Sequence, residues 1–303
     1  MIAKKETPTA ATEPKATTPW VRFRRNKLAV AGLVVIIGLV LLAIFAPWIA
    51  PADPNRQDLL AKFAAPGTPM RASMGGSTYL FGADSLGRDL LSRTIWGARI
   101  SLMVGVVSET LIVLIGVTMG SLAGYYGRWV DQVISRLCEI LFAFPDLLFA
   151  IAMMFALGSG LLNLFITLAV ISWAGMARLV RSQVLQLKER EYVQAAKAAG
   201  AKDWWVILRH ILPNAIGPII VSATLGVPGA IMAEASLSFL GLGVKPPTAT
   251  WGYMIYDGRQ YLMSNPLVSV IPGVAVMLTV LAFNLFGDGL RDAFDPRAKQ
   301  KGA

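Results

Sequence analysis

Long stretches without charged side chains constrain this chain more than any other feature. Residues 28–52 and 147–177 contain no Asp, Glu, Lys or Arg. As a helix, each is long enough to cross the hydrocarbon core of a bilayer, which is about 30 Å thick. Only 15% of the 303 residues are charged and 55% are hydrophobic, whereas soluble domains carry about 25% charged residues. The chain is therefore predicted to be an all-α membrane protein.

The apolar runs predict six transmembrane helices. These cover residues 28–52, 100–127, 138–157, 161–178, 211–244 and 262–287. The third and fourth come from one apolar run that residues 158–160, Gly-Ser-Gly, divide. The step 144–146, Phe-Pro-Asp, is expected to kink the third helix. In the second helix, Gly116, Gly120 and Gly124 recur every four residues on one face, which favours close helix packing.

The distribution of positive charge predicts the orientation in the membrane. Twenty of the 28 Lys and Arg residues fall within residues 1–27, 125–137, 178–209 and 291–303. Positive loops favour the cytoplasmic side, so both termini are predicted to be cytoplasmic. A net charge of +10 can also indicate nucleic-acid binding. In a membrane protein, however, such a surplus more often reflects cytoplasmic loops, and we expect no nucleic-acid partner.

We divide the chain into four parts. Residues 1–27 are expected to be a disordered basic cytoplasmic tail, and residues 28–98 the first transmembrane helix plus an external segment. Residues 99–290 would form a five-helix core, and residues 291–303 a cytoplasmic C-terminal tail. A signal peptide is the alternative for the N-terminus, but the run 28–52 exceeds the usual apolar region of such a peptide.

The external segment is expected to end in an interfacial helix within residues 82–102. Arg88, Asp89 and Arg93 lie there among apolar side chains at helical spacing. Such an amphipathic helix would lie along the lipid headgroups and lead into the second span.

A polar, basic loop over residues 188–213 separates two apolar runs. Ala195 and Ala196 favour a helix, and Gly200 is typical of a helix end. A second helix would begin near Asp203 and carry two tryptophans. This helix–glycine–helix unit, with small residues on one side and tryptophans on the other, suits docking into a partner's groove. An amphipathic helix on the lipid headgroups fits the pattern equally well.

The spacing of small residues and proline in this loop resembles the EAA loop of ABC-importer permeases, through which the membrane subunit grips its ATPase. Two positions depart from that pattern: Gln194 stands where it has glutamate, and His210 where it usually has isoleucine. The resemblance implies an ATPase-coupling role for Gln194, Ala195, Ala196, Gly200, His210, Leu212 and Pro213.

Four further segments resemble the C-type permeases of the dipeptide/oligopeptide/nickel branch. They are SLGRDLLSR (85–93), RHILPN (209–214), ASLSFLGLGVKPPTATWG (235–252) and FGDGLRDAFDPR (286–297). The resemblance implies the type I importer fold in a bacterial or archaeal cell membrane. It also implies four kinds of partner: a second homologous permease, two ATP-binding-cassette ATPases, an external or periplasmic substrate-binding protein, and the lipid bilayer. Peptides would be the usual cargo and nickel a less frequent one.

The sequence predicts neither an enzyme nor a bound cofactor. His210 is the only histidine and Cys138 the only cysteine, so no His-based triad, multi-His metal site or intrachain disulfide can form. The phosphate-binding motif G-x-x-x-x-G-K-[ST] is absent. We therefore expect ATP and Mg²⁺ to be bound by partner subunits.

Glu109 and Glu234 are carboxylates within predicted spans, where a charge is costly and usually faces protein or water. They would contact a peptide's amino terminus or a cation in the pore, or bond to a neighbouring helix near a span end. We favour the second interpretation. The first also fits a self-contained secondary transporter, but such proteins typically contain internal repeats, and we find no convincing one.

Overall fold

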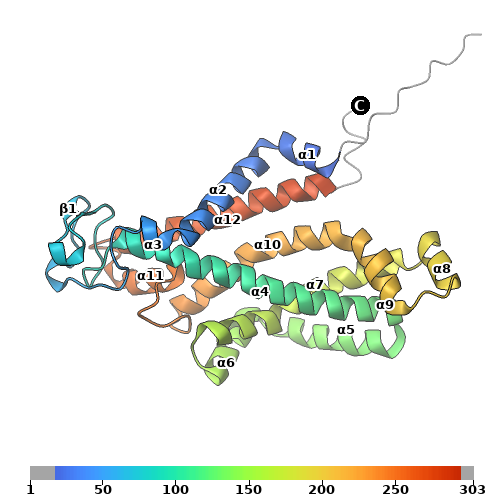
Figure 1. The fold of residues 1–303 in the computed structure, drawn as a ribbon. Coiled ribbons are helices and arrows are strands. Elements are labelled where there is room, and N and C mark those ends of the chain that lie inside the picture. The colour runs from blue at the N-terminus through green and yellow to red at the C-terminus, as the bar shows by residue number, and fades with distance from the viewer. Residues whose placement is uncertain (1–17, 295–303) are drawn as a thin grey trace, which may run out of the picture.

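The computed structural model describes residues 18–294 and is built almost entirely of helices (Figure 1). Within that range, five helices are long and apolar enough to cross a membrane. They are α2 (Lys27–Ile44), α4 (Leu90–Tyr126), α7 (Leu161–Leu187), α10 (Leu212–Phe239, with the helical turns before it) and α12 (Leu267–Phe294). The other predicted span corresponds to α5 (Arg128–Ala143) and α6 (Asp146–Leu157), which meet the same criteria only as a pair.

The pair α5–α6 bends by 94° at its break, which confirms the kink predicted for this stretch. Pro145 precedes α6, and Phe144 has extended backbone angles, because a proline ring disfavours helical conformation in the residue before it. The start predicted for this span, at residue 138, is wrong. α5 begins at Arg128, so most of the loop expected over residues 125–137 is helical.

Helices α4 and α7 pack closely through the predicted glycine stripe. A Cβ atom added to Gly120 would lie 2.4 Å from the carbonyl oxygen of Ala177, and one added to Gly124 would lie 2.8 Å from Val184 Cβ. Gly116 is equally tight against α7. These glycines therefore bring the two backbones together, as small residues do in membrane helix pairs.

Helices α2 and α12 run side by side, and the tails predicted next to them are partly helical (Figure 1). α1 (Pro19–Arg25) lies within the tail predicted over residues 1–27. Its Phe23 packs edge-on against Phe286 of α12, with ring centroids 5.6 Å apart. α12 likewise extends into the tail predicted over residues 291–303. The rest of both tails lies outside the described residues.

Short elements gather at two opposite ends of the bundle (Figure 1). One end holds α3 (Ala46–Ile49), η1 (Leu59–Ala61), β1 (Thr68–Pro69), η2 (Ala72–Met74), β2 (Thr78–Tyr79), α11 (Trp251–Gly258) and η4 (Arg259–Tyr261). β1 and β2 form an antiparallel pair. The other end holds α8 (Glu191–Ala198), α9 (Asp203–Val206) and the π-helical turn η3 (Ile207–Ile211), which joins α9 to α10.

The first turns of α4 differ from the prediction. The helix begins at Leu90 and continues without a break, so the predicted boundary between residues 98 and 99 lies inside it. The interfacial helix predicted over residues 82–102 is wrong. Arg88 and Arg93 are only 4% and 1% exposed, and they therefore do not face lipid headgroups.

Candidate functional site

The loop between α7 and α10 is shaped by Gly200. The Gly200 amide donates a 2.9 Å hydrogen bond to the carbonyl oxygen of Lys197, and the Ala201 amide donates one of 3.1 Å to that of Ala196. This pair of bonds closes α8 with a left-handed glycine at φ 83°. A Cβ atom added to Gly200 would meet nothing within 4 Å. The glycine is thus required by backbone conformation, and the space in front of it is open.

A hollow of about 730 Å³ lies at this turn, which we call the loop hollow. Ala196 and Gly200 line it together with Trp204, Trp205 and His210. The small residues and the tryptophans were predicted on opposite sides of the unit, and that placement is wrong. Because the chain reverses at Gly200, the two sets face a common concave surface.

The loop hollow brings together only some of the residues predicted to couple to an ATPase. Gln194 and Ala195 lie on the exposed surface of α8, and the Gln194 side-chain amide donates a 2.8 Å hydrogen bond to the carbonyl oxygen of Lys188. Leu212 and Pro213 lie instead in the first turn of α10, where they line a separate hollow beside α4.

His210 is held by aromatic rings. Its ring meets that of Trp205 edge-on at 4.7 Å, and the Tyr192 ring lies 6.5 Å away. In the part of the chain that is described, the buried Nε2 atom of His210 has no hydrogen-bond partner. His210 therefore forms part of the hollow's wall, with one nitrogen left for a further contact.

The loop is attached to α4 by contacts that the sequence did not predict. The Tyr125 hydroxyl donates a 2.7 Å hydrogen bond to Asp203 Oδ1, and Lys197 lies over the Tyr125 ring at 4.7 Å. The Lys188 ammonium group donates a 3.0 Å bond to the carbonyl oxygen of Gly124. No local pattern marks these residues, because the contacts join segments distant in the chain.

A second hollow, of about 530 Å³, lies among α4, α6, α7 and α10, and we call it the inner hollow. Glu109 lines it from the middle of α4 and is 6% exposed, so the position near a span end that we favoured is wrong for this residue. Glu234 lies near the end of α10, as that interpretation expects, but it accepts its 2.7 Å hydrogen bond from Ser238 Oγ of the same helix.

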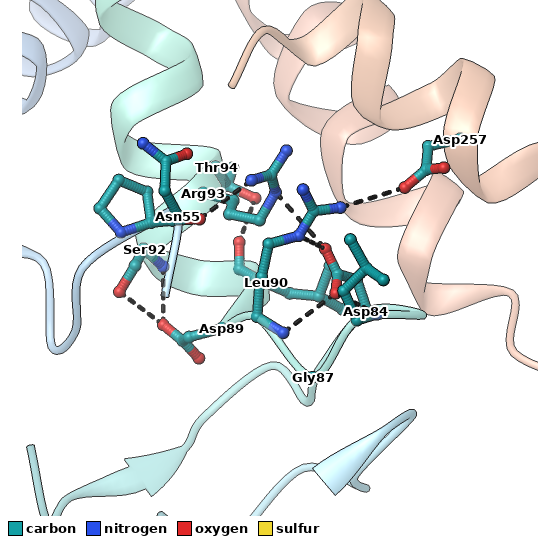
Figure 2. Close-up of polar contacts among 12 residues, drawn as sticks. Asn55, Asp84, Gly87, Asp89, Leu90, Ser92, Arg93, Thr94 and Asp257 are labelled. Atoms are coloured by element: carbon teal, nitrogen blue, oxygen red, sulfur yellow. Dashed lines mark hydrogen bonds and ion pairs between the residues drawn. The ribbon is translucent and has the colours of Figure 1, made fainter. Parts of the chain in front are cut away.

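A buried ionic cluster lies at the end of the molecule opposite the loop hollow (Figure 2). The Arg88 guanidinium contacts Asp84 Oδ2 at 2.6 Å and Asp257 Oδ2 at 3.2 Å. Arg93 donates a 2.9 Å hydrogen bond to the carbonyl oxygen of Pro54. Burial raises the pKa of Asp257, although the nearby Arg88 opposes that shift. The cluster ties the segment between α3 and α4 to both α4 and α11.

Family models match both parts of the chain. Residues 116–300 match the binding-protein-dependent transport system inner membrane component. Residues 18–66 match the N-terminal transmembrane domain of oligopeptide transport permease C. This chain belongs to the family of binding-protein-dependent inner-membrane transport components. It is a permease subunit of that family, and its several apolar helices are consistent with a multi-pass protein of the cell membrane.

Relatives of this permease are similar over nearly its whole length. It is 42% identical to the dipeptide transport system permease protein DppC of Alkalihalophilus pseudofirmus, over 99% of this chain and 97% of that protein. It is 45% identical to the glutathione transport system permease protein GsiD of Escherichia coli, over 92% of this chain and 90% of that protein. These similarities confirm the predicted branch of permeases.

The fold of this permease is also found in solved structures. An inward-facing structure of the MetNI methionine ABC transporter matches 68% of this chain and 98% of the compared chain, with a TM-score of 0.56 and 20% identity. A second crystal form of that transporter gives a TM-score of 0.54. The likeness confirms the predicted importer-permease fold.

Proposed function

We propose that this permease forms half of the translocation pathway of an ATP-driven importer for dipeptides or oligopeptides. The observation that carries the proposal is the full-length similarity to dipeptide and glutathione permeases. Across residues 18–294, no group of three or more His, Cys, Asp or Glu side chains is placed to hold a metal ion. Because both relatives are named for peptide cargos, we favour peptides over nickel as the cargo.

The complete transporter would contain a second homologous permease, two ATPase subunits and an external substrate-binding protein. ATP and Mg²⁺ would bind to the ATPases, and this chain would hold no cofactor. We place the protein in a bacterial or archaeal cell membrane with both termini in the cytoplasm, since most of its Lys and Arg residues lie in segments that would then be cytoplasmic.

The loop hollow is the surface on which we expect the ATPase to dock. Trp204 and Trp205 are 59% and 41% exposed there, and exposed aromatic side chains around a concavity are typical of binding sites. A projection of the ATPase would enter between these rings and Gly200. Gln194 and Ala195 would extend the contact along α8. Leu212 and Pro213 would act through the start of α10.

Movement of the docked ATPase would reach the membrane through rigid connections. α9, the π-helical turn and α10 form one continuous helix from Asp203 to Phe239, and the Tyr125–Asp203 bond attaches its first turn to α4. ATP binding can shift the transporter between two states only if the ATPase holds the loop differently in each. The continuous helix would then move the wall that α10 contributes to the inner hollow.

Reconstitution with the partner subunits tests this proposal. The purified assembly in proteoliposomes should take up a labelled dipeptide only with both Mg-ATP and the binding protein present. If this permease purifies alone and moves solute without ATP, the proposal fails in favour of a secondary transporter.

A further inference from the structure

The inner hollow has a wall of small side chains that nothing covers in the single chain. Gly175 of α7 and Gly229 of α10 line it, and a Cβ atom added to either would meet nothing within 4 Å. The stripe glycines of α4, at positions 116, 120 and 124, differ, since each lies against α7. Ser172 and Ser222 add hydroxyl groups to this wall. An uncovered wall of glycine and serine suits a passage for a polar solute.

Glu109 reaches this hollow as a buried carboxylate without a partner. It is 6% exposed, and no hydrogen bond or ion pair joins it to another described residue. Its carboxylate lies over Gly226, where an added Cβ atom would be 2.2 Å from Oε2. The glycine thus makes room for the carboxylate. A buried carboxylate is costly unless it is paired, so the site is one that a cation would complete.

Asp146 supplies a second carboxylate to the same hollow. It stands at the first residue of α6 and forms no hydrogen bond or ion pair with any residue in the range 18–294. None of the residues lining the hollow is Lys, Arg or His. With two acids and no compensating base, the hollow carries a negative potential, and its low-dielectric walls strengthen that potential.

We propose that Glu109 and Asp146 hold the protonated amino group of a peptide during its passage through the permease. The inference rests on the peptide-import function proposed above. An ammonium group donates three hydrogen bonds, which two carboxylates and the serine hydroxyls of the wall can accept. A divalent metal ion is less well suited, since the described residues bring no third acidic, His or Cys ligand to this place. The volume of about 530 Å³ accommodates a small peptide.

The test compares peptides with and without the amino group in the reconstituted transporter. Uptake of tri-alanine and of its des-amino analogue is measured with the same binding protein for wild type, Glu109→Gln and Asp146→Asn. Glu139→Gln is the matched control, because the Glu139 carboxylate is 55% exposed and pairs with Arg136 outside the inner hollow. Since the binding protein is the same throughout, a change in the uptake ratio belongs to the permease.

We expect the preference for the free amine to fall by about tenfold in each of the two variants, as loss of a charge-assisted hydrogen bond predicts. Glu139→Gln should keep the wild-type preference. An unchanged preference in Asp146→Asn, whose exposed position makes misfolding no explanation, overturns the inference and leaves the proposed function intact. A wild-type transporter that moves both compounds equally has the same consequence. If wild type moves no peptide at all, the proposed function itself fails.

Discussion

The Tyr125 hydroxyl lies 2.7 Å from Asp203 Oδ1 and so joins the end of α4 to the first residue of α9. Tyr125 precedes α7 in the chain and Asp203 follows it, so their bond attaches the loop between α7 and α10 to α4. α4 also packs tightly on α7 through its glycines. One side chain thus connects the proposed ATPase contact to a closely packed helix pair.

Tyr125→Phe removes that hydroxyl while keeping the ring beneath Lys197. We expect uptake per ATP hydrolysed to fall several-fold, because the loop would then follow α4 less closely, through the remaining contacts of Lys188 and Lys197. Loss of one hydrogen bond costs only about 1 kcal/mol, so the transporter should still assemble. Tyr126→Phe is the matched control, since no hydrogen bond of its hydroxyl is found in the described chain. Equal coupling ratios for the two variants would contradict this role.

Gly120→Ala tests the α4–α7 contact. The added methyl group would lie 2.4 Å from the Ala177 carbonyl oxygen, which is backbone and cannot swing away. Overpacking of this kind costs about 1–3 kcal/mol, so the midpoint of thermal unfolding in detergent should fall by several degrees. The methyl group added by Gly38→Ala in α2 meets nothing within 4 Å, so this variant should not lower the midpoint. A comparable loss in both variants would mean that the two helices are not held by this contact.

Asp89→Asn tests how burial affects charge at the start of α4. Burial raises the pKa of Asp89 above its usual value near 3.8. The protonated form is therefore favoured by folding, and its contribution to stability is complete below pH about 3.8 and is lost as pH rises through the raised pKa. Asparagine caps a helix about as well as aspartate.

The expected result is a gain in unfolding temperature for Asp89→Asn over wild type that is larger at pH 7 than at pH 4. Asp53→Asn, at an exposed carboxylate, is the matched control for the loss of a carboxylate. A gain for Asp89→Asn that does not change with pH would show that burial does not control this carboxyl group.

Arg88→Lys tests the ionic cluster of Figure 2. Lysine keeps the charge but lacks the planar fork that contacts Asp84 and Asp257 together. Complete removal of one partner of a buried ion pair costs about 3–5 kcal/mol. Loss of one of the two contacts should cost less but should still make residues 53–89 more accessible to protease. Arg71→Lys is the control, because Arg71 is 56% exposed in its pair with Asp58. Resistance to protease in Arg88→Lys would show that the fork geometry is not needed.

Local chemistry explains what the sequence could predict. The break at Pro145, the glycine stripe of α4 and the turn at Gly200 each follow from residues close together in the chain. The break follows from the restricted backbone around a proline, the stripe from the small size of glycine, and the turn from the positive φ that glycine adopts. The apolar runs likewise located the spans, because a bilayer demands a minimum length of apolar helix.

Long-range contacts explain what the sequence could not predict. Arg88 and Arg93 look like residues of an interfacial helix until Asp257, far away in the chain, is brought beside them. Glu109 lies in mid-helix opposite Gly226, a pairing of two different spans. The loop hollow also escaped prediction, because the reversal at Gly200 determines which faces of α8 and α9 meet.

Recovery of the ATPase with the affinity-purified permease tests the central claim, docking at the loop hollow, most directly. Gly200→Asp is compared with Gly158→Asp, since both glycines have φ 83° and open space at Cβ. The control is a strict one, because the ψ of 164° at Gly158 lies in a region that essentially only glycine adopts. We expect both variants to reach the membrane, Gly158→Asp to retain the ATPase and Gly200→Asp to lose it together with peptide uptake. Full ATPase recovery and uptake with Gly200→Asp would contradict docking at this hollow.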